Sequence, residues 1–190
     1  MDTHRQLILV KHSLPAIVEN VPAREWNLSS EGKIRARRLA EELELYQPEI
    51  ILTSVEPKAR QTAEILAEHF HLEFAAVNCL HEHDRSGIPF YSTDEFQSHV
   101  RELFAKPNTL VFGNETGLQA LERFRKTIES ILESYKSKNV IIVSHGTVIS
   151  LFISWLTGMD GYLLWKELGL PSFVALDMQS KTLLKTENID

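Results

Sequence analysis

Residues 7–15 read LILVKHSLP: four apolar residues lead directly into a lysine, a histidine and a serine. The run is short and carries β-branched side chains at Ile8 and Val10, which indicates a buried strand. Residues 50–54 (IILTS) and 140–146 (VIIVSHG) repeat this form. The sequence therefore predicts three buried strands, each of which ends in polar or ionisable residues.

Helical patterns lie between and after these strands. Residues 28–32 (LSSEG) are expected to open one helix with Ser29 as its cap, and Pro57 suits the first turn of a second. Apolar residues between 118 and 135 lie on one helical face, and residues 147–156 form a strongly apolar helix. Strands that alternate with helices predict a three-layer α/β/α sandwich with a mostly parallel sheet.

Residues 79–113 differ from the rest of the chain. They contain four of the nine phenylalanines and two prolines, without a sustained helical or strand period. We interpret them as a small irregular or helical insertion over the C-terminal edge of the sheet, within one domain of residues 1–190. Its aromatic residues could cover a substrate, but a small core that holds the insertion together is the favoured interpretation. Residues 173–178 are expected to form the last strand.

Composition limits the classes of function. A chain of 190 residues with 43% hydrophobic content can form one sizeable core, and the net charge of −6 disfavours binding to nucleic acid or membranes. The single cysteine, Cys79, cannot form an internal disulfide, which fits a reducing compartment, and we interpret it as a small apolar filler. The apolar run near the N-terminus is too short for a signal peptide, and no stretch approaches a membrane span. We therefore expect a soluble, cytoplasmic protein.

The polar strand ends point to a ligand site. Ligands of open α/β sheets bind beyond the carboxyl ends of the strands, where helix N-termini favour anions. His12 and His145 each follow a predicted strand, and Lys11 and Lys58 lie close to two strand ends. A single histidine in such a place is more often a hydrogen-bonded bystander, but two at equivalent points favour a shared site. We expect a phosphate pocket that two imidazoles face.

The motifs also occur in a familiar order. VKHS (10–13) stands where a known family has Arg-His-Gly, and LSSEGKIRARRLAEEL (28–43) resembles its next helix. SVEPKARQTA (54–63) resembles the pattern Ser-Pro-Leu-x-Arg-Ala-x-Gln-Thr-Ala. GNET (113–116) resembles a Gly-Glu-Ser/Thr element, and VSHGTVI (143–149) resembles the second histidine motif. In this ordered set, over nearly the whole chain, the protein resembles the histidine phosphatase superfamily, which is also called phosphoglycerate mutase-like.

The resemblance implies a metal-independent phosphomonoester hydrolase of the histidine acid phosphatase type. His12 would be the nucleophile that forms a phosphohistidine, and a protonated His145 would stabilise the transferring group. Glu82, whose position after Leu80 resembles the family's Leu-x-Glu, would be the general acid with a raised pKa; Asp84 is the alternative. The expected partner is a small phosphomonoester or phosphate anion. No cofactor is expected, and the sequence leaves the oligomeric state open.

Two departures from the family pattern concern phosphate binding. Lysines replace both arginines of the pocket, and a serine replaces the glycine after the first histidine. Lysine keeps the positive charge but lacks the flat, two-pronged grip of arginine on phosphate. Arg60 cannot compensate, because two residues along a helix correspond to about 200° around its axis. The residues assigned to phosphate binding are Lys11, Ser13, Lys58, Arg85 and Gly146.

The sequence also allows a zinc site and two functions other than that of a phosphatase. His81 and His83 would share a face on a strand and could bind zinc, although no third ligand has a supporting spacing. A phosphoglycerate mutase would use the same histidines as a phosphatase. A phosphate-sensing or protein-binding module with little turnover would explain the two lysines.

Overall fold

The central strands are apolar except at their ends because the sheet is buried on both faces. In the computed structural model of the protein, which describes residues 5–190, Leu7 and Leu9 belong to one hydrophobic cluster. Ile8 and Val10, which alternate with them, belong to a second cluster on the opposite face. The core therefore consists of two halves separated by the sheet.

The sheet has six strands in the order β3-β2-β4-β1-β5-β6. Strands β3, β2, β4 and β1 are parallel, and β5 and β6 are antiparallel to their neighbours. The expected mostly parallel sheet is confirmed. β5 corresponds to the strand expected at residues 173–178, whereas β3 and β6 were not predicted, so β5 is not the last strand. The strands are β1 (Gln6–Lys11), β2 (Ile50–Thr53), β3 (Phe74–Ala76), β4 (Val140–Ser144), β5 (Ser172–Asp177) and β6 (Thr182–Asn188).

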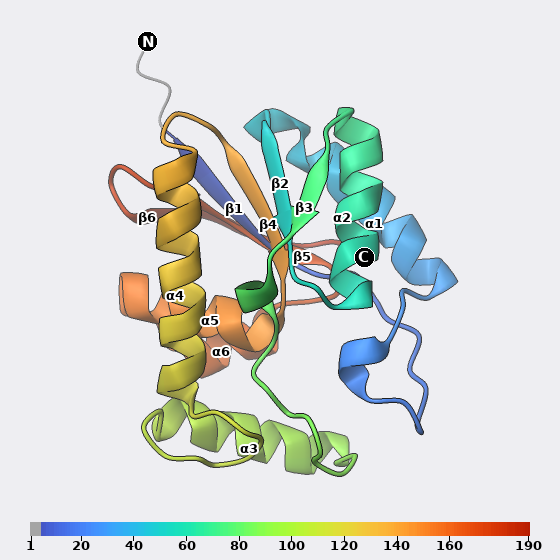
Figure 1. Cartoon of the computed structure of the whole chain (residues 1–190), viewed down its shortest axis with the longest axis vertical. Coiled ribbons are helices and arrows are strands. Elements are labelled where there is room, and N and C mark those ends of the chain that lie inside the picture. Colours follow the sequence, from blue (N-terminus) through green and yellow to red (C-terminus); the bar gives the residue numbers. More distant parts are fainter. Residues whose placement is uncertain (1–4) are drawn as a thin grey trace.

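Helices cover both faces of this sheet (Figure 1). Helices α1 (Ser30–Leu43) and α2 (Pro57–Phe70) pack on one face, and α4 (Gly117–Ser134) and α5 (Gly146–Thr157) pack on the other. The predicted caps are present: Ser29 accepts a hydrogen bond from the backbone of Gly32, and Pro57 lies in the first turn of α2. The three-layer α/β/α architecture is thus confirmed. The remaining helices are α3 (Thr93–Ala105), α6 (Gly161–Glu167) and the short 3₁₀ turns η1 (Ala23–Glu25), η2 (Glu44–Tyr46) and η3 (Asn78–Leu80).

The segment 79–113 contains helix α3, which begins with a capping box made by Ser92 and Glu95. In Figure 1, α3 lies beyond the carboxyl ends of the parallel strands. Phe112 is buried, and Phe96 packs against the same hydrophobic cluster, whereas Phe90 is 68% exposed. Most of these aromatic side chains therefore contribute to packing, as expected, but they join the cluster that includes the sheet instead of forming a small core of their own.

Two further expectations concern exposure to solvent and the N-terminus. Cys79 is exposed, so its interpretation as an apolar filler was wrong: it lies in η3, beyond the sheet, instead of under a helix.

Within residues 5–190, no helix has the length and apolar content that crossing a membrane requires. The expectation about a signal peptide includes residues 1–4, which lie outside the described part of the chain.

Candidate active site

Strand register brings the two histidines together. β1 and β4 are parallel neighbours in which Lys11 pairs with Ser144, and the His12 amide donates to the Ser144 carbonyl over 3.0 Å. The residues that follow these strands therefore meet at the same sheet edge. The ring centroids of His12 and His145 are 5.1 Å apart, with an interplanar angle of 63°. The predicted convergence of two distant sequence positions is present in the structure.

His12 is arranged as a neutral imidazole with a free ring nitrogen. Its Nδ1 lies 2.8 Å from the Ser13 carbonyl oxygen, which can only accept a hydrogen bond. Nδ1 therefore carries the proton, and the lone pair is on Nε2. Burial holds the pKa of His12 well below its ordinary value, and nearby His145 and Lys58 add to this effect. A neutral imidazole with this tautomer is the form in which histidine acts as a nucleophile.

His145 is almost fully buried and lies among polar groups. Its Nε2 is 2.8 Å from Ser54 Oγ and 3.3 Å from Glu56 Oε1, whereas Nδ1 has no hydrogen-bond partner among residues 5–190. Burial holds the pKa of His145 well below its ordinary value; Lys58 acts in the same direction and Glu82 opposes it. Burial, helped by the charge of Lys58, thus favours a neutral ring, in contrast to the expected imidazolium.

Lys58 is buried in the first turn of α2, and its ammonium is already paired. Its Nζ donates to Glu56 Oε2 over 2.6 Å and to the Ala23 carbonyl over 2.7 Å. Arg60 is exposed, as its angle around the helix predicts. The sequence reasoning missed Glu56, although a signal was present: this carboxylate stands where the family pattern quoted above has leucine.

Lys11, the second lysine of the predicted pocket, is also engaged with the protein. Its Nζ donates to the Leu168 carbonyl over 2.6 Å. Burial lowers the pKa of Lys11 to about 8, against the attraction of Glu82. A Cβ atom at Gly146 would lie 3.2 Å from Lys11 Cε, so glycine at this position leaves space for the lysine side chain. Lys11 can thus lose its proton under mildly alkaline conditions.

Ser13 is fully buried, and both its hydroxyl and its amide donate hydrogen bonds to the neighbouring helices. Its hydroxyl donates to the Gly32 carbonyl over 2.7 Å, and its amide donates to Thr62 Oγ1 over 3.0 Å. Helix α1 approaches closely here, because a Cβ atom at Gly32 would lie 2.0 Å from the Leu14 carbonyl oxygen. The hydroxyl of Ser13 therefore holds the loop against α1, and binding phosphate would require it to rotate.

Glu82 lies close to His145, whereas Asp84 is occupied elsewhere. Glu82 Oε2 accepts from the Thr147 amide over 3.2 Å and lies 3.3 Å from an Arg85 nitrogen. Asp84 Oδ1 accepts from the amide and hydroxyl of Ser86, over 2.9 Å and 2.6 Å. Of the two candidate acids, Glu82 is the one that interacts with His145.

The electrostatic environment of Glu82 differs from the expected one. Burial would raise the pKa of its carboxyl, but Arg85, His145 and the amides of His83 and Thr147 together lower it to about 2. The prediction of a raised pKa is thus at odds with the structure. Arg85 itself lies between this carboxylate and the Phe96 ring, whose centroid is 4.8 Å from the guanidinium carbon.

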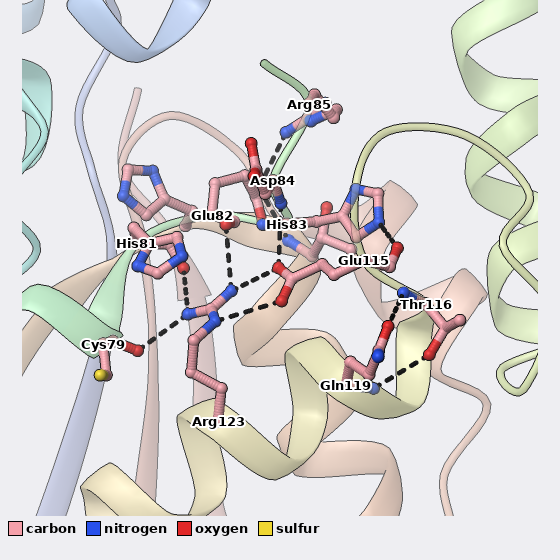
Figure 2. A network of polar contacts seen from close by, with 12 residues as sticks. Cys79, His81, Glu82, His83, Asp84, Arg85, Glu115, Thr116, Gln119 and Arg123 are labelled. Carbon is pink, nitrogen blue, oxygen red and sulfur yellow. Dashed lines mark hydrogen bonds and ion pairs between the residues drawn. The ribbon is translucent and has the colours of Figure 1, made fainter.

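The loop that carries Glu82 is tied to helix α4 by Arg123 and Glu115 (Figure 2). The Arg123 guanidinium donates to Glu115 Oε1 over 2.6 Å, and to the carbonyls of Cys79, His81 and Glu82 over 2.8, 3.0 and 3.1 Å. Glu115 Oε1 also accepts from the Asp84 amide over 2.9 Å. The sequence reasoning missed Arg123, whose partners lie far upstream in the chain.

His81 and His83 make separate contacts instead of facing a common point. His81 Nδ1 lies 2.6 Å from the Asn78 carbonyl oxygen, and His83 Nε2 lies 2.7 Å from that of Glu115. Over the described range 5–190, no group of three or more His, Cys, Asp and Glu side chains is placed to hold a metal ion. Each ring is thus held by one backbone carbonyl, while Nδ1 of His83 is buried without a hydrogen-bond partner in the described part of the chain.

Solved structures of other proteins share this fold. Among solved structures, the fold is similar to phosphoserine phosphatase from Entamoeba histolytica in complex with 3-phosphoglyceric acid (TM-score 0.79, 16% identity, 98% of each chain). It is also similar to a mycobacterial glucosyl-3-phosphoglycerate phosphatase (TM-score 0.76, 18% identity, 97% of this chain and 98% of that one). Bacillus stearothermophilus YhfR has a TM-score of 0.74 and 20% identity, with 98% of each chain covered.

Sequence comparisons identify the family. The "Uncharacterized phosphatase PhoE" of Bacillus subtilis (strain 168) is 26% identical over 133 residues, which cover 70% of this chain and 66% of that protein. The model of the histidine phosphatase superfamily (branch 1) matches residues 9–185, a span that includes His12, Glu82 and His145. The chain therefore belongs to branch 1 of the histidine phosphatase superfamily.

Proposed function

We propose that this protein is a metal-independent phosphomonoester hydrolase that works through a phosphohistidine at His12. The observation that carries the proposal is the paired arrangement of His12 and His145, whose ring centroids are 5.1 Å apart at the end of β1 and β4. The Nδ1 contact of His12 with its own loop leaves Nε2 as the attacking atom. Membership of the family supports the same reaction class.

In the first step, His12 Nε2 attacks phosphorus, so that a P–N bond forms while the P–O bond to the leaving group breaks. The alkoxide that departs needs a proton, and Glu82 is the proposed donor. Water then attacks phosphorus, the P–N bond breaks, and the proton of the water passes to the Glu82 carboxylate. The cations proposed to hold the phosphoryl oxygens are Lys11, Lys58 and Arg85.

Glu82 must gain a proton before it can act as an acid, because its pKa of about 2 leaves it ionised near neutral pH. A bound phosphoryl group would raise the pKa of Glu82 and so favour this protonation. Its negative charges would offset Arg85, which is the main group that keeps the carboxylate ionised. We therefore propose that the acidic form of Glu82 arises only with the substrate in place.

A second candidate is a phosphate-binding module with little turnover, and one observation favours it. Both lysines of the pocket donate to acceptors of the protein: Lys58 to Glu56 and Ala23, and Lys11 to Leu168. Phosphate would have to compete with these partners. Such a module would bind phosphate but would hydrolyse phosphate esters slowly or not at all.

An activity assay separates the two candidates. The protein is incubated in chelator with a panel of phosphomonoesters that includes phosphoserine and glucosyl-3-phosphoglycerate, alongside His12→Ala. The matched control is His69→Ala, which removes a histidine from the surface of α2 where it pairs with Glu44. Hydrolysis that is lost in His12→Ala and retained in the control supports the phosphatase. Hydrolysis that persists in His12→Ala contradicts it, and binding of phosphate without hydrolysis favours the module.

A further inference from the structure

Glu56 places a negative charge among the groups proposed to hold the phosphoryl group. Its Oε2 lies 2.6 Å from Lys58 Nζ, and its Oε1 lies 3.3 Å from His145 Nε2. The same Oε1 accepts from the Glu82 amide over 3.0 Å. The residue is only 8% exposed, so this carboxylate lies within the cluster of Lys58, His145 and Glu82 and not on the outer surface.

The positive groups of the pocket have few donors left for an anion. A lysine ammonium has three N–H donors, and Lys58 uses two of them, on Glu56 and the Ala23 carbonyl. An oxyanion that reaches both Lys58 and His145 must therefore lie against the oxygens of Glu56. A fully ionised oxyanion in contact with the Glu56 carboxylate would be strongly repelled, because solvent screening is weak in a buried site.

A proton between the two groups changes this repulsion into a hydrogen bond. A phosphoryl group has a second pKa of about 6, so it can keep a proton near neutral pH, whereas sulfate cannot. A protonated phosphoryl oxygen can donate to the Glu56 carboxylate, and a charge-assisted hydrogen bond of this kind is short and strong. An oxyanion without a proton presents only acceptors to Glu56.

We propose that Glu56 is a specificity-determining residue: its carboxylate accepts a hydrogen bond from a protonated phosphoryl oxygen and thereby selects singly protonated phosphate over fully ionised oxyanions. This inference rests on the phosphate pocket of the proposed function. Lys58 stays paired with Glu56 while the remaining donors of the pocket hold the other phosphoryl oxygens. The titratable and charged groups near Glu56 come from several elements. They are Lys58 on α2, Lys11 at the end of β1, His12 directly after it, Glu82 and Arg85 after η3, and His145 before α5.

The test compares the binding of inorganic phosphate and of sulfate at pH 6 by titration calorimetry, in wild type, in Glu56→Gln and in the surface control Glu44→Gln. Glutamine keeps the shape of the side chain but can donate to an ionised oxyanion. We expect wild type and the control to prefer phosphate at least tenfold. In Glu56→Gln, the ratio of the two affinities should fall by at least tenfold, mainly because sulfate binds more tightly.

A second measurement uses the unaltered protein and does not depend on whether the variant folds. Protons taken up by His145 or other protein groups would help both anions equally, whereas a proton on phosphate helps phosphate alone. The preference of wild type for phosphate over sulfate should therefore fall about tenfold per pH unit above the second pKa of phosphate.

The outcomes separate this inference from the proposed function. Phosphate binding with equal affinity for sulfate, an unchanged ratio in folded Glu56→Gln, or a preference that does not vary with pH overturns the role of Glu56 and leaves the phosphatase intact. Failure of wild type and Glu56→Gln to bind either anion overturns the phosphate pocket itself, and the proposed function with it.

Discussion

Replacing Arg123 by methionine tests how the loop that carries Glu82 is held in place. The change removes a guanidinium that donates to Glu115 and to the carbonyls of Cys79, His81 and Glu82 (Figure 2). The carboxylate of Glu115 and three carbonyls would lose their donor, while methionine keeps much of the length of the apolar stem. We expect losses of both stability and catalytic rate.

The structure sets the size of each loss. Breaking a buried ion pair by removing one partner costs about 3–5 kcal/mol. The side chains of Arg123 and Glu115 are 15% and 14% exposed, so solvent recovers part of that energy and the lower end applies. We therefore expect the free energy of unfolding to fall by about 3 kcal/mol. A displacement of Glu82 by roughly 1 Å would lower kcat about 10²-fold.

Urea unfolding and steady-state kinetics with an alkyl phosphate measure the two effects. The matched control is Arg125→Met on the same helix, where Arg125 pairs with Glu122 and Glu129 on the surface, and we expect only a small change. Arg123→Lys should restore part of the activity. An unaltered unfolding energy in Arg123→Met would refute the structural reasoning. A loss of stability with unaltered kcat would refute the link to Glu82.

Three other predictions concern charges in the pocket. Lys58→Ala should weaken inhibition by vanadate or phosphate, because it removes a cation of the pocket and leaves Glu56 without its partner, whereas Lys58→Arg should retain inhibition. Unchanged inhibition in Lys58→Ala would count against the assignment of Lys58 to phosphate binding. Burial lowers the pKa of Lys11 from 10.5 to about 8 in the folded protein. Between pH 8 and 10.5 the unfolded state therefore binds more protons than the folded state, and the free energy of unfolding should rise by about 3 kcal/mol as the pH increases across that range. Phosphate affinity should fall over the same range, and Lys11→Met should remove both trends in unfolding and binding titrations. Glu82→Gln should slow hydrolysis of alkyl phosphates by about 10²–10⁴-fold, but slow that of an aryl phosphate with a good leaving group much less; equal losses for both substrates would contradict its role as an acid.

Much of the fold was predictable because its signals are local. The strands that precede His12 and His145 have apolar interiors, as burial on both faces requires, and parallel strands align their carboxyl ends. Helix α3 was not resolved from sequence because its buried residues, Val100 and Leu103, occupy a short stretch among polar ones. Strand β6 was missed because it is only half-buried, with exposed residues at alternate positions.

The details of the site depend on contacts that no local pattern reveals. The ionised state of Glu82 results from the position of Arg85 and from two backbone amides, which only the folded loop brings together. Arg123 contacts residues more than forty positions upstream. Glu56 was the exception, since its departure from leucine lies within a motif that was recognised. It adds a negative charge to the motif, and this charge pairs with the positive charge that Lys58 retains.

In the proposed mechanism, phosphorus becomes bonded to His12 during turnover. Rapid quenching with a ³²P-labelled phosphomonoester, followed by peptide mapping, detects this bond. We expect an acid-labile, base-stable label on the peptide that contains His12, formed within the first turnover and absent from His12→Ala. A label on another residue, or hydrolysis by wild type at an unchanged rate in His12→Ala, would contradict it.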